Sequence, residues 1–177
     1  MARLKDEYAN RVVPELEKSL GTTNKMLVPR LQKIVINMAF GIVSKDEQKA
    51  VVDDLAAITG QRPMLCRAKK SISNFKLREG MVIGAKVTLR SDRMWEFAER
   101  LIATALPRIR DFRGVPNRGF DGSGNYTLGI KEHTVFPEVA ESSAHAGMDI
   151  TFVTSTTDNK AARQLLAALG MPFAGRN

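Results

Sequence analysis

Apolar and polar residues alternate in two segments of the chain, and a period of two predicts β-strands. The inward sides carry Ile34, Ile36 and Met38 in residues 32–38, and Ala85, Val87 and Leu89 in residues 82–90. The outward sides carry Lys33 and Asn37 in the first segment, and Lys86, Thr88 and Arg90 in the second. Residues 61–66 read as a short extended piece, and 126–130, 133–136 and 149–154 as further strands. Each long strand therefore has one apolar face and one polar face.

Apolar residues spaced three or four apart predict helices between these strands. The first helix covers residues 4–20, where Pro14 predicts a kink or a break. A second helix is predicted between Ser44 and Gly60. Ser44 and Glu47 form the pattern of a capping box at its start, and Gly60 ends it. A third helix opens at Ser91-Asp92 and ends near residue 107, and a fourth runs from Asp158 to residue 170.

The order of these elements predicts an α+β fold. Strands with one polar face favour a mostly antiparallel sheet of about five strands, with helices on one face only. Residues 67–80 and 108–126 lack a period and read as long exposed loops, of which the first is basic. A chain of 177 residues with no linker or repeat is expected to be a single domain over 1–177.

Charge is the most informative feature of the composition. Lys and Arg total 27 against 19 acidic residues, which gives a net charge of +8 and a pI near 9.9. Such an excess favours a polyanionic partner such as nucleic acid. A single cysteine fits a reducing compartment, and no apolar run is long enough to cross a membrane. We expect a cytoplasmic protein with no membrane partner.

The sequence gives little support to catalysis, a metal site or a cofactor. Its two histidines, His133 and His145, and Cys66 match no zinc-ligand spacing, and Cys66 reads as a packing residue. The glycines of residues 119–124 lack the ending of a P-loop and read as a flexible surface loop. The adjacent carboxylates Asp53 and Asp54 read as solvated residues on a helix surface.

The basic segment is the stronger signal. Residues 62–93 carry nine basic and two acidic side chains, an excess of seven that nearly equals the excess of the whole chain. Ser71, Ser73 and Asn74 can hydrogen-bond phosphates and riboses, and Phe75 can stack or insert. The polar strand faces add a second surface. Because these faces carry no outward aromatic pair, they favour a shaped RNA over a loose single strand.

Several long motifs in this order resemble one family. They are residues 28–30 (VPR), 36–38 (INM), 60–63 (GQRP), 69–76 (KKSISNFK), 86–90 (KVTLR), 106–114 (LPRIRDFRG), 120–126 (FDGSGNY) and 136–138 (FPE). Together they are similar to the bacterial large-subunit ribosomal protein L5 family, whose members bind 5S ribosomal RNA. The chain departs from the family pattern at Ala39, Val82 and Ser123, and these departures affect individual loop contacts.

The resemblance implies three sets of site residues. The expected 5S RNA site is Lys33, Asn37, Gln61, Thr88 and Arg90. The loop expected to contact transfer RNA in the peptidyl (P) site carries Lys69, Lys70, Ser71, Ser73, Asn74, Lys76 and Arg78. The region expected to bridge to a protein of the small-subunit head carries Arg108, Arg110, Asp111 and Arg113. Further implied partners are large-subunit ribosomal RNA and other large-subunit proteins of the central protuberance.

Together with the resemblance, these features predict a structural, non-enzymatic protein of the large ribosomal subunit. Two alternatives stay open on the residues alone. One is a free-standing RNA-binding regulator that uses the same basic surface. The other is a phosphoryl-handling enzyme built on residues 119–124.

Overall fold

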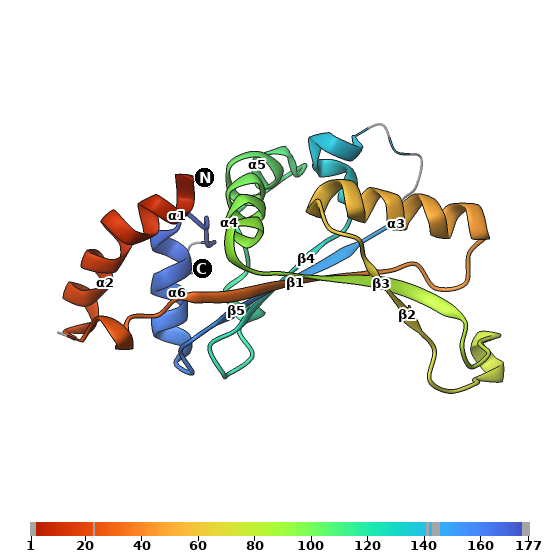
Figure 1. Ribbon diagram of the computed structural model, residues 1–177, viewed down its shortest axis with the longest axis horizontal. Helices are drawn as coiled ribbons and strands as arrows, with labels where there is room; N and C mark the ends of the chain where they lie inside the picture. The colour runs from red at the N-terminus through yellow and green to blue at the C-terminus, as the bar shows by residue number, and fades with distance from the viewer. Residues whose placement is uncertain (1–2, 23, 141, 143–145, 175–177) are drawn as a thin grey trace. The chain divides into compact units, whose positions relative to one another are not determined.

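The computed structural model describes residues 3–22, 24–140, 142 and 146–174. Its α-helices are α1 (Arg3–Glu7), α2 (Val13–Leu20), α3 (Lys45–Thr59), α4 (Ser91–Arg100), α5 (Leu106–Arg108) and α6 (Asn159–Ala168). Its strands are β1 (Leu31–Ala39), β2 (Met64–Arg67), β3 (Val82–Leu89), β4 (Tyr126–Ile130) and β5 (Met148–Thr154) (Figure 1).

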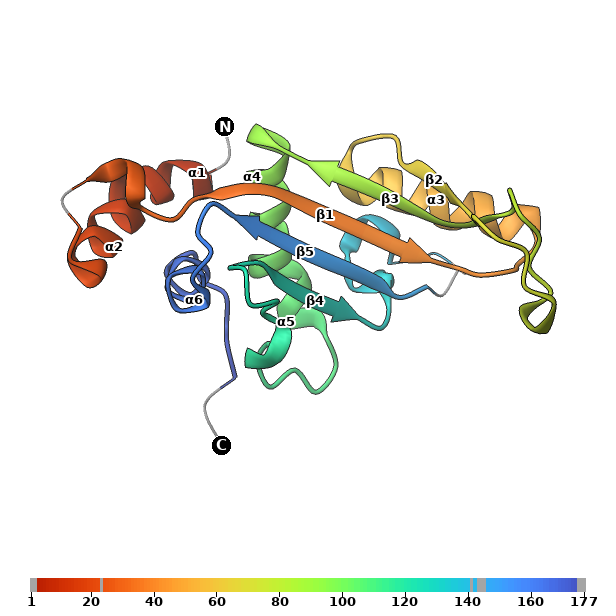
Figure 2. The same ribbon diagram turned by 90° about the horizontal axis from the view of Figure 1, so that it is seen from below.

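The strands form one five-stranded sheet in the order β2-β3-β1-β5-β4. Strand β2 pairs antiparallel with β3, and neighbouring arrows in Figure 2 run in opposite directions. The predicted α+β class with a five-stranded antiparallel sheet is therefore confirmed. The inward residues predicted for β1 and β3 are all at most 2% exposed, so the face assignment of both strands is confirmed as well.

The described chain divides into two compact units. Unit 1 comprises residues 1–34, 89–128 and 151–177, and unit 2 comprises residues 35–88 and 129–150. The expectation of a single domain over 1–177 stays a prediction.

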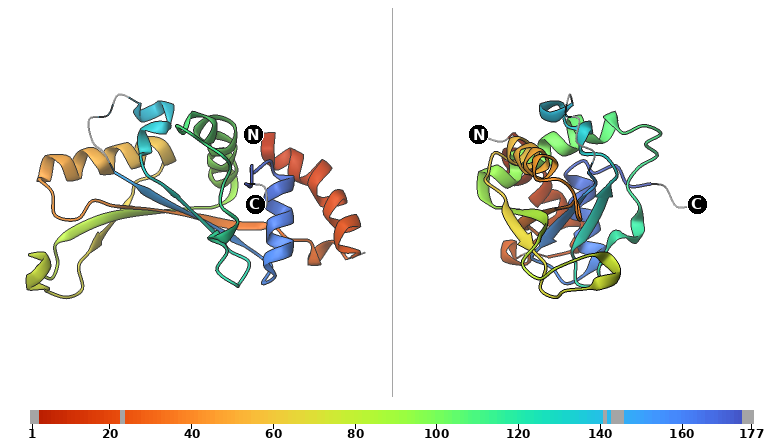
Figure 3. Two further views of the ribbon diagram at one scale, coloured as in Figure 1. Left: turned by 180° about the vertical axis from the view of Figure 1, so that it is seen from behind. Right: turned by 90° about the vertical axis from the view of Figure 1, so that its right-hand side faces the viewer.

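Unit 1 is mainly helical. Helix α2 lies beside α6, and α4 continues through a π-helical turn, Leu101–Ala105, into α5 (Figure 3). The helical turns that begin at Arg3 continue to Leu20 without a break, because a π-helical turn, Tyr8–Val12, joins α1 to α2. Pro14 directly follows this π-helical turn, and inside a continuous helix it has no N–H to donate to the preceding turn. The irregularity predicted at Pro14 is thus a widened turn that precedes it.

In unit 2, helix α3 covers one face of the strands, and no helix among the described residues of this unit covers the opposite face. The predicted capping box is present, since Ser44 Oγ accepts from Glu47 N at 3.2 Å and Glu47 Oε2 accepts from Ser44 N at 3.0 Å. Gly60 ends the helix at φ +63°. Val51, Leu55 and Ile58 of α3 are buried and form the core beneath β1 and β3.

The structure corrects the expected strand at 133–136. His133–Val135 is a 3₁₀-helical turn, and the His133 side chain is fully buried. Its Nδ1 lies 3.0 Å from the Ala146 carbonyl oxygen and its Nε2 3.0 Å from Asp54 Oδ2. These contacts to distant residues fix a turn where the local pattern of alternation favours a strand.

Candidate nucleic-acid interface

The sheet face of unit 2 that lies opposite α3 carries polar side chains. Asn37 of β1 and Thr88 of β3 are partly exposed, and Lys86 is exposed. They alternate with buried residues of the α3 side, so the pleat turns all three outward. Strands β1 and β3 are neighbours in the sheet, which brings the outward residues of both strands onto one surface.

Gln61 joins this surface from the turn after α3. Its Nε2 donates to the Thr88 carbonyl oxygen at 3.5 Å. Thr59 holds this turn in place. Its buried hydroxyl donates to the Leu55 carbonyl oxygen at 2.7 Å and accepts from Gln61 N at 3.4 Å. Gln61, distant in sequence from Thr88, is therefore held at the edge of the same polar face.

Two of the five residues predicted for 5S RNA lie in unit 1. Lys33 is half-buried and shares the outward side of β1 with Asn37. Arg90 is exposed and is the N-cap residue of α4, with an extended backbone. The group that the structure assembles within unit 2 is thus Asn37, Gln61 and Thr88. Lys86 lies on the same face, as its place in the alternation predicts, although the set implied for 5S RNA does not include it.

The segment between β2 and β3, expected as an irregular loop, has a folded tip. Ile72 and Leu77 form an isolated antiparallel bridge, with N···O distances of 2.9 and 3.0 Å. Within the bridge, Ser73–Phe75 forms a 3₁₀ turn that Lys76 ends in the left-handed conformation. At the base, Ala68 N donates to the Met81 carbonyl oxygen at 2.8 Å and Gly80 N donates to the Ala68 carbonyl oxygen at 3.0 Å. The segment is a hairpin extension of β2 and β3 with a defined backbone.

Most side chains of this hairpin tip are exposed to solvent. All seven residues predicted for this region are exposed, namely Lys69, Lys70, Ser71, Ser73, Asn74, Lys76 and Arg78. Phe75 is 71% exposed at the end of the tip. A hairpin tip that carries both an exposed aromatic ring and exposed Lys and Arg side chains suits contact with a nucleic acid, whose bases stack and whose phosphates pair with Lys and Arg.

The third predicted set lies in unit 1 and begins at Arg108, the last residue of α5. Arg108, Arg110, Asp111 and Arg113 are all exposed, and Asp111 turns the backbone at φ +55°. The region is not exposed throughout, since Val115 is fully buried. Its N–H donates to the Pro172 carbonyl oxygen at 2.8 Å and its carbonyl oxygen accepts from Ala174 N at 2.9 Å. The charged turn is therefore held at its far end by the C-terminal segment.

Asp54 is not the solvated surface residue expected from the sequence. Its Oδ2 lies 3.0 Å from His133 Nε2 and accepts from Ser142 Oγ at 2.6 Å. In this arrangement the carboxylate sits between the imidazole and the hydroxyl, whereas a catalytic triad needs the imidazole in the middle. The three residues tie α3 to the segment before β5. His145 lies outside the described residues.

The glycine loop at 119–124 is a packed turn and not a flexible one. A Cβ on Gly119 would lie 2.5 Å from the Thr127 carbonyl oxygen. Asp121 Oδ1 accepts from Ser123 N and Asn125 N, and Gly124 N donates to Asn159 Oδ1 at 2.9 Å. Hydrogen bonds from the Asn125 side-chain amide and from the backbone N–H groups of Ser123 and Asn125 hold the pKa of Asp121 below its usual range. Because these N–H groups are already bonded within the protein, they are not available to bind a phosphate, which argues against a phosphoryl-handling enzyme.

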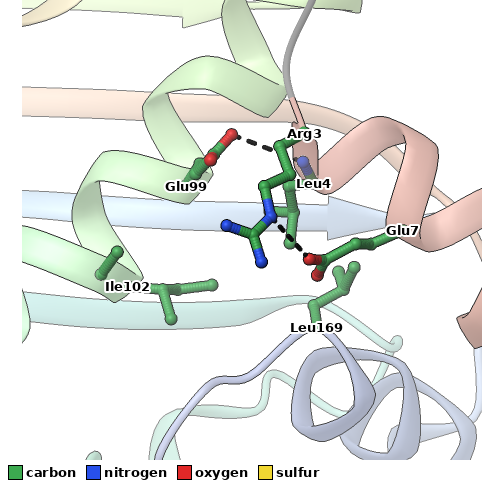
Figure 4. A pocket seen from close by; sticks show the side chains of 7 residues that line it. Arg3, Leu4, Glu7, Glu99, Ile102 and Leu169 are labelled. Carbon is green, nitrogen blue, oxygen red and sulfur yellow. Dashed lines mark hydrogen bonds and ion pairs between the residues drawn. The ribbon is translucent and has the colours of Figure 1, made fainter.

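A cavity of about 250 Å³ in unit 1 is lined by Leu4, Ile102, Ala103 and Leu169 together with charged residues of α1 and α4 (Figure 4). Glu7 Oε1 pairs with Arg3 Nε at 3.1 Å, and Glu99 Oε2 accepts from Leu4 N at 3.4 Å. The carboxylates thus have partners inside the protein. Among the described residues, no cluster of His, Cys, Asp or Glu is arranged to hold a metal ion, and no helix is long and apolar enough to cross a membrane.

Two family models match the chain. The model described as ribosomal protein L5 matches residues 24–78, and the model described as the C-terminus of the same ribosomal family matches residues 82–173. Curated relatives named large ribosomal subunit protein uL5 are 52% identical over 177 residues in Rubrobacter xylanophilus and in Desulforamulus reducens. In both cases the match covers 98% of this chain and 98% of the relative. A relative of the same name in Alkaliphilus oremlandii is 53% identical over 179 residues, which is 98% of this chain and 99% of the relative. With two models and full-length relatives in agreement, the chain belongs to the ribosomal protein L5 family of the large subunit.

Proposed function

We propose that this ribosomal protein binds 5S ribosomal RNA through the polar sheet face of unit 2 and helps to attach that RNA to the large subunit in the central protuberance. Asn37, Gln61 and Thr88 supply the hydrogen bonds, with Lys33 and Arg90 adding charge toward phosphates. The observation that supports this proposal is the helix-free face that carries Asn37 and Thr88, with Gln61 bonded to the Thr88 carbonyl oxygen at its edge.

We assign the two other predicted contacts to the two remaining groups of exposed charged residues. The tip of the β2–β3 hairpin contacts P-site transfer RNA, and Arg108, Arg110, Asp111 and Arg113 contribute to a bridge with a protein of the small-subunit head. Large-subunit ribosomal RNA and other proteins of the central protuberance complete the surroundings. The protein acts by binding and carries out no catalysis.

The test is the affinity of the purified protein for 5S RNA at several salt concentrations. Asn37→Ala and Thr88→Ala should each weaken binding by about 1–3 kcal/mol, because each removes a hydrogen bond from a dry interface. Both side chains point away from the core, so the free energy of unfolding should change little. Thr157→Ala, at an exposed threonine before α6, is the matched control and should keep full affinity.

The salt dependence adds an independent measurement. If about five phosphates are neutralised, log K should fall with log salt with a slope of several units. A slope near zero, or equal affinity for unrelated structured RNA, contradicts the proposal. Sucrose-gradient fractionation separates the ribosomal role from a free-standing RNA-binding regulator, since only the former requires stoichiometric sedimentation with large subunits.

A further inference from the structure

A groove in unit 2 has no part in the RNA contacts proposed above. Its volume is about 250 Å³, and its walls are Lys45, Gln48, Lys49 and Val52 of α3, Leu65 of β2 and Val82 of β3. The four α3 residues follow the spacing i, i+3, i+4, i+7 and so form one stripe of the helix. This groove, named here the α3–β2 groove, lies on the sheet side opposite the polar face.

The floor of the groove is apolar surface left open at the edge of the sheet. Leu65 pairs with Ala85 across the antiparallel ladder, and paired residues place their side chains on the same face. Ala85 is fully buried beneath α3, yet Leu65 is 43% exposed. Strand β2 is the terminal strand of the sheet, and residues of α3 line one groove with Leu65 without covering it fully. The apolar side of the edge strand is therefore only partly covered.

The rim of the groove is positively charged. Lys45 and Lys49 are exposed one turn apart, and neither has an ion-pair partner among the described residues. Helix α3 has four acidic side chains. Glu47 caps the helix and Asp54 bonds His133 and Ser142, and the other two, Asp46 and Asp53, are exposed but do not line the groove. Gln48 Nε2 is tied back to the Val43 carbonyl oxygen at 3.3 Å. The groove thus combines an aliphatic floor with two free cations.

These dimensions fit one anchoring side chain. Small-molecule sites commonly measure ~300–1,000 Å³, which is more than this groove offers, whereas a cavity of ~150 Å³ already admits a benzene ring. RNA fits less well, because the walls offer no aromatic ring for a base to stack on and only two cations for a backbone. Aliphatic walls below a basic rim instead complement a large apolar side chain flanked by carboxylates.

We propose that the α3–β2 groove binds a short acidic segment of another protein, which inserts one large apolar side chain between Val52, Leu65 and Val82 and pairs its carboxylates with Lys45 and Lys49. The proposal does not depend on the RNA contacts, since it uses the other face of unit 2. It adds a protein-binding site to a chain whose other charged surfaces suit nucleic acid.

The test is a titration of the full-length protein with an acetylated and amidated peptide, Asp-Glu-Phe-Glu-Asp, followed by NMR of the methyl groups of Val52, Leu65 and Val82. These methyl signals should shift together and saturate at millimolar peptide. A peptide with Ala in place of Phe should bind at least tenfold more weakly, because it lacks the apolar anchor. A peptide with Lys in place of the acidic residues should leave the signals unmoved.

Charge reversal supplies the matched control. The double variant Lys45→Glu/Lys49→Glu should bind the acidic peptide at least tenfold more weakly, because two attractions become repulsions. Lys18→Glu/Lys160→Glu makes the same change in net charge at exposed lysines of unit 1 and should bind as the unchanged chain does. Equal loss in both variants would reduce the effect to net charge and overturn the proposal.

Two further outcomes also contradict it. One is that the Phe and Ala peptides bind equally, which would mean that the groove holds no anchor. The other is that a single-stranded RNA oligonucleotide of equal charge shifts the same methyl signals at lower concentration than the peptide, which would make the groove part of the RNA-binding surface.

Discussion

Asp54 holds two segments of unit 2 together through one carboxylate, which bonds His133 and Ser142. Replacement by Ala leaves the fully buried His133 imidazole without its Nε2 partner. An unsatisfied buried polar group costs ~1–3 kcal/mol, so Asp54→Ala should lower the free energy of unfolding in urea by that amount.

Asp53→Ala is the control for that measurement. Asp53 precedes Asp54 on α3 and is exposed, so its loss should change the unfolding free energy by less than about 0.5 kcal/mol. If the two variants are equally stable, the hydrogen bonds of Asp54 contribute nothing and the assignment is wrong.

Tyr126 is expected to make stability sensitive to alkaline pH. Its hydroxyl donates to the Pro116 carbonyl oxygen at 2.8 Å, and burial raises the pKa of its phenol from 10.0 to about 12. In the unfolded chain the phenol ionises at its ordinary pKa, so the folded state loses this stabilisation as the pH rises from 10 to about 12.

Absorbance titration of the phenolate provides the measurement. The chain has two tyrosines, and burial also raises the pKa of Tyr8. In a titration with base, phenolate absorbance should therefore appear at higher pH in the folded protein than in the urea-unfolded protein, where both tyrosines ionise at their ordinary pKa. Tyr126→Phe removes one of the two transitions. Ionisation of both tyrosines near pH 10 in the folded state would show that neither phenol is protected.

At the scale of elements, the turn at 119–124 depends on glycine for two different reasons. Gly122 has φ +85° with open space around it. Gly124 has φ +77°, and a Cβ there would overlap the Thr156 carbonyl group. Backbone at positive φ disfavours any Cβ by about 1 kcal/mol, but only at Gly124 is a steric overlap added.

We therefore expect Gly124→Ala to destabilise the protein by several kcal/mol and Gly122→Ala by about 1 kcal/mol. Thermal unfolding of the two variants measures the difference, because each adds one methyl group to the same turn. Equal melting temperatures would mean that the Thr156 segment moves away at little cost.

The elements that the sequence predicts well are those specified by neighbours along the chain. The capping box of α3 needs only Ser44 and Glu47, and the face of β1 needs only its alternation. The failures arise where a distant residue decides. His133 forms a turn because Asp54 and Ala146 bond its ring, and no local pattern encodes that contact.

The candidate site shows the same division. The outward positions of Asn37 and Thr88 follow from strand period, so the sequence could predict them. The bond from Gln61 to Thr88 depends on how the turn after α3 meets β3, and the residues at 61–63 contain no signal for it. The folded tip at 72–77 depends on the backbone bridge between Ile72 and Leu77. The polar sequence around these residues has no period that could predict this bridge.

For the whole molecule, the distribution of charge matters more than its total. Most of the +8 excess comes from residues 62–93, which include the hairpin tip, while the polar sheet face carries more hydrogen-bonding groups than charge. We therefore expect the two surfaces to contribute separately to function, the tip through phosphate charge and the sheet face through hydrogen bonds.

The triple variant Lys70→Ala/Lys76→Ala/Arg78→Ala tests this separation. The three side chains are exposed, and the bridge that shapes the tip is made by the backbone of Ile72 and Leu77. The variant should therefore fold and bind isolated 5S RNA with unchanged affinity. In assembled ribosomes it should release P-site transfer RNA faster by roughly tenfold, because three exposed charge contacts contribute ~0.2–1 kcal/mol each.

Replacing Lys18, Lys25 and Lys160 with Ala removes the same charge from unit 1 and should leave the off-rate unchanged. A large loss of 5S affinity in the tip variant, with an unchanged off-rate, would assign the hairpin tip to the 5S site, since cations that never touch transfer RNA cannot slow its release.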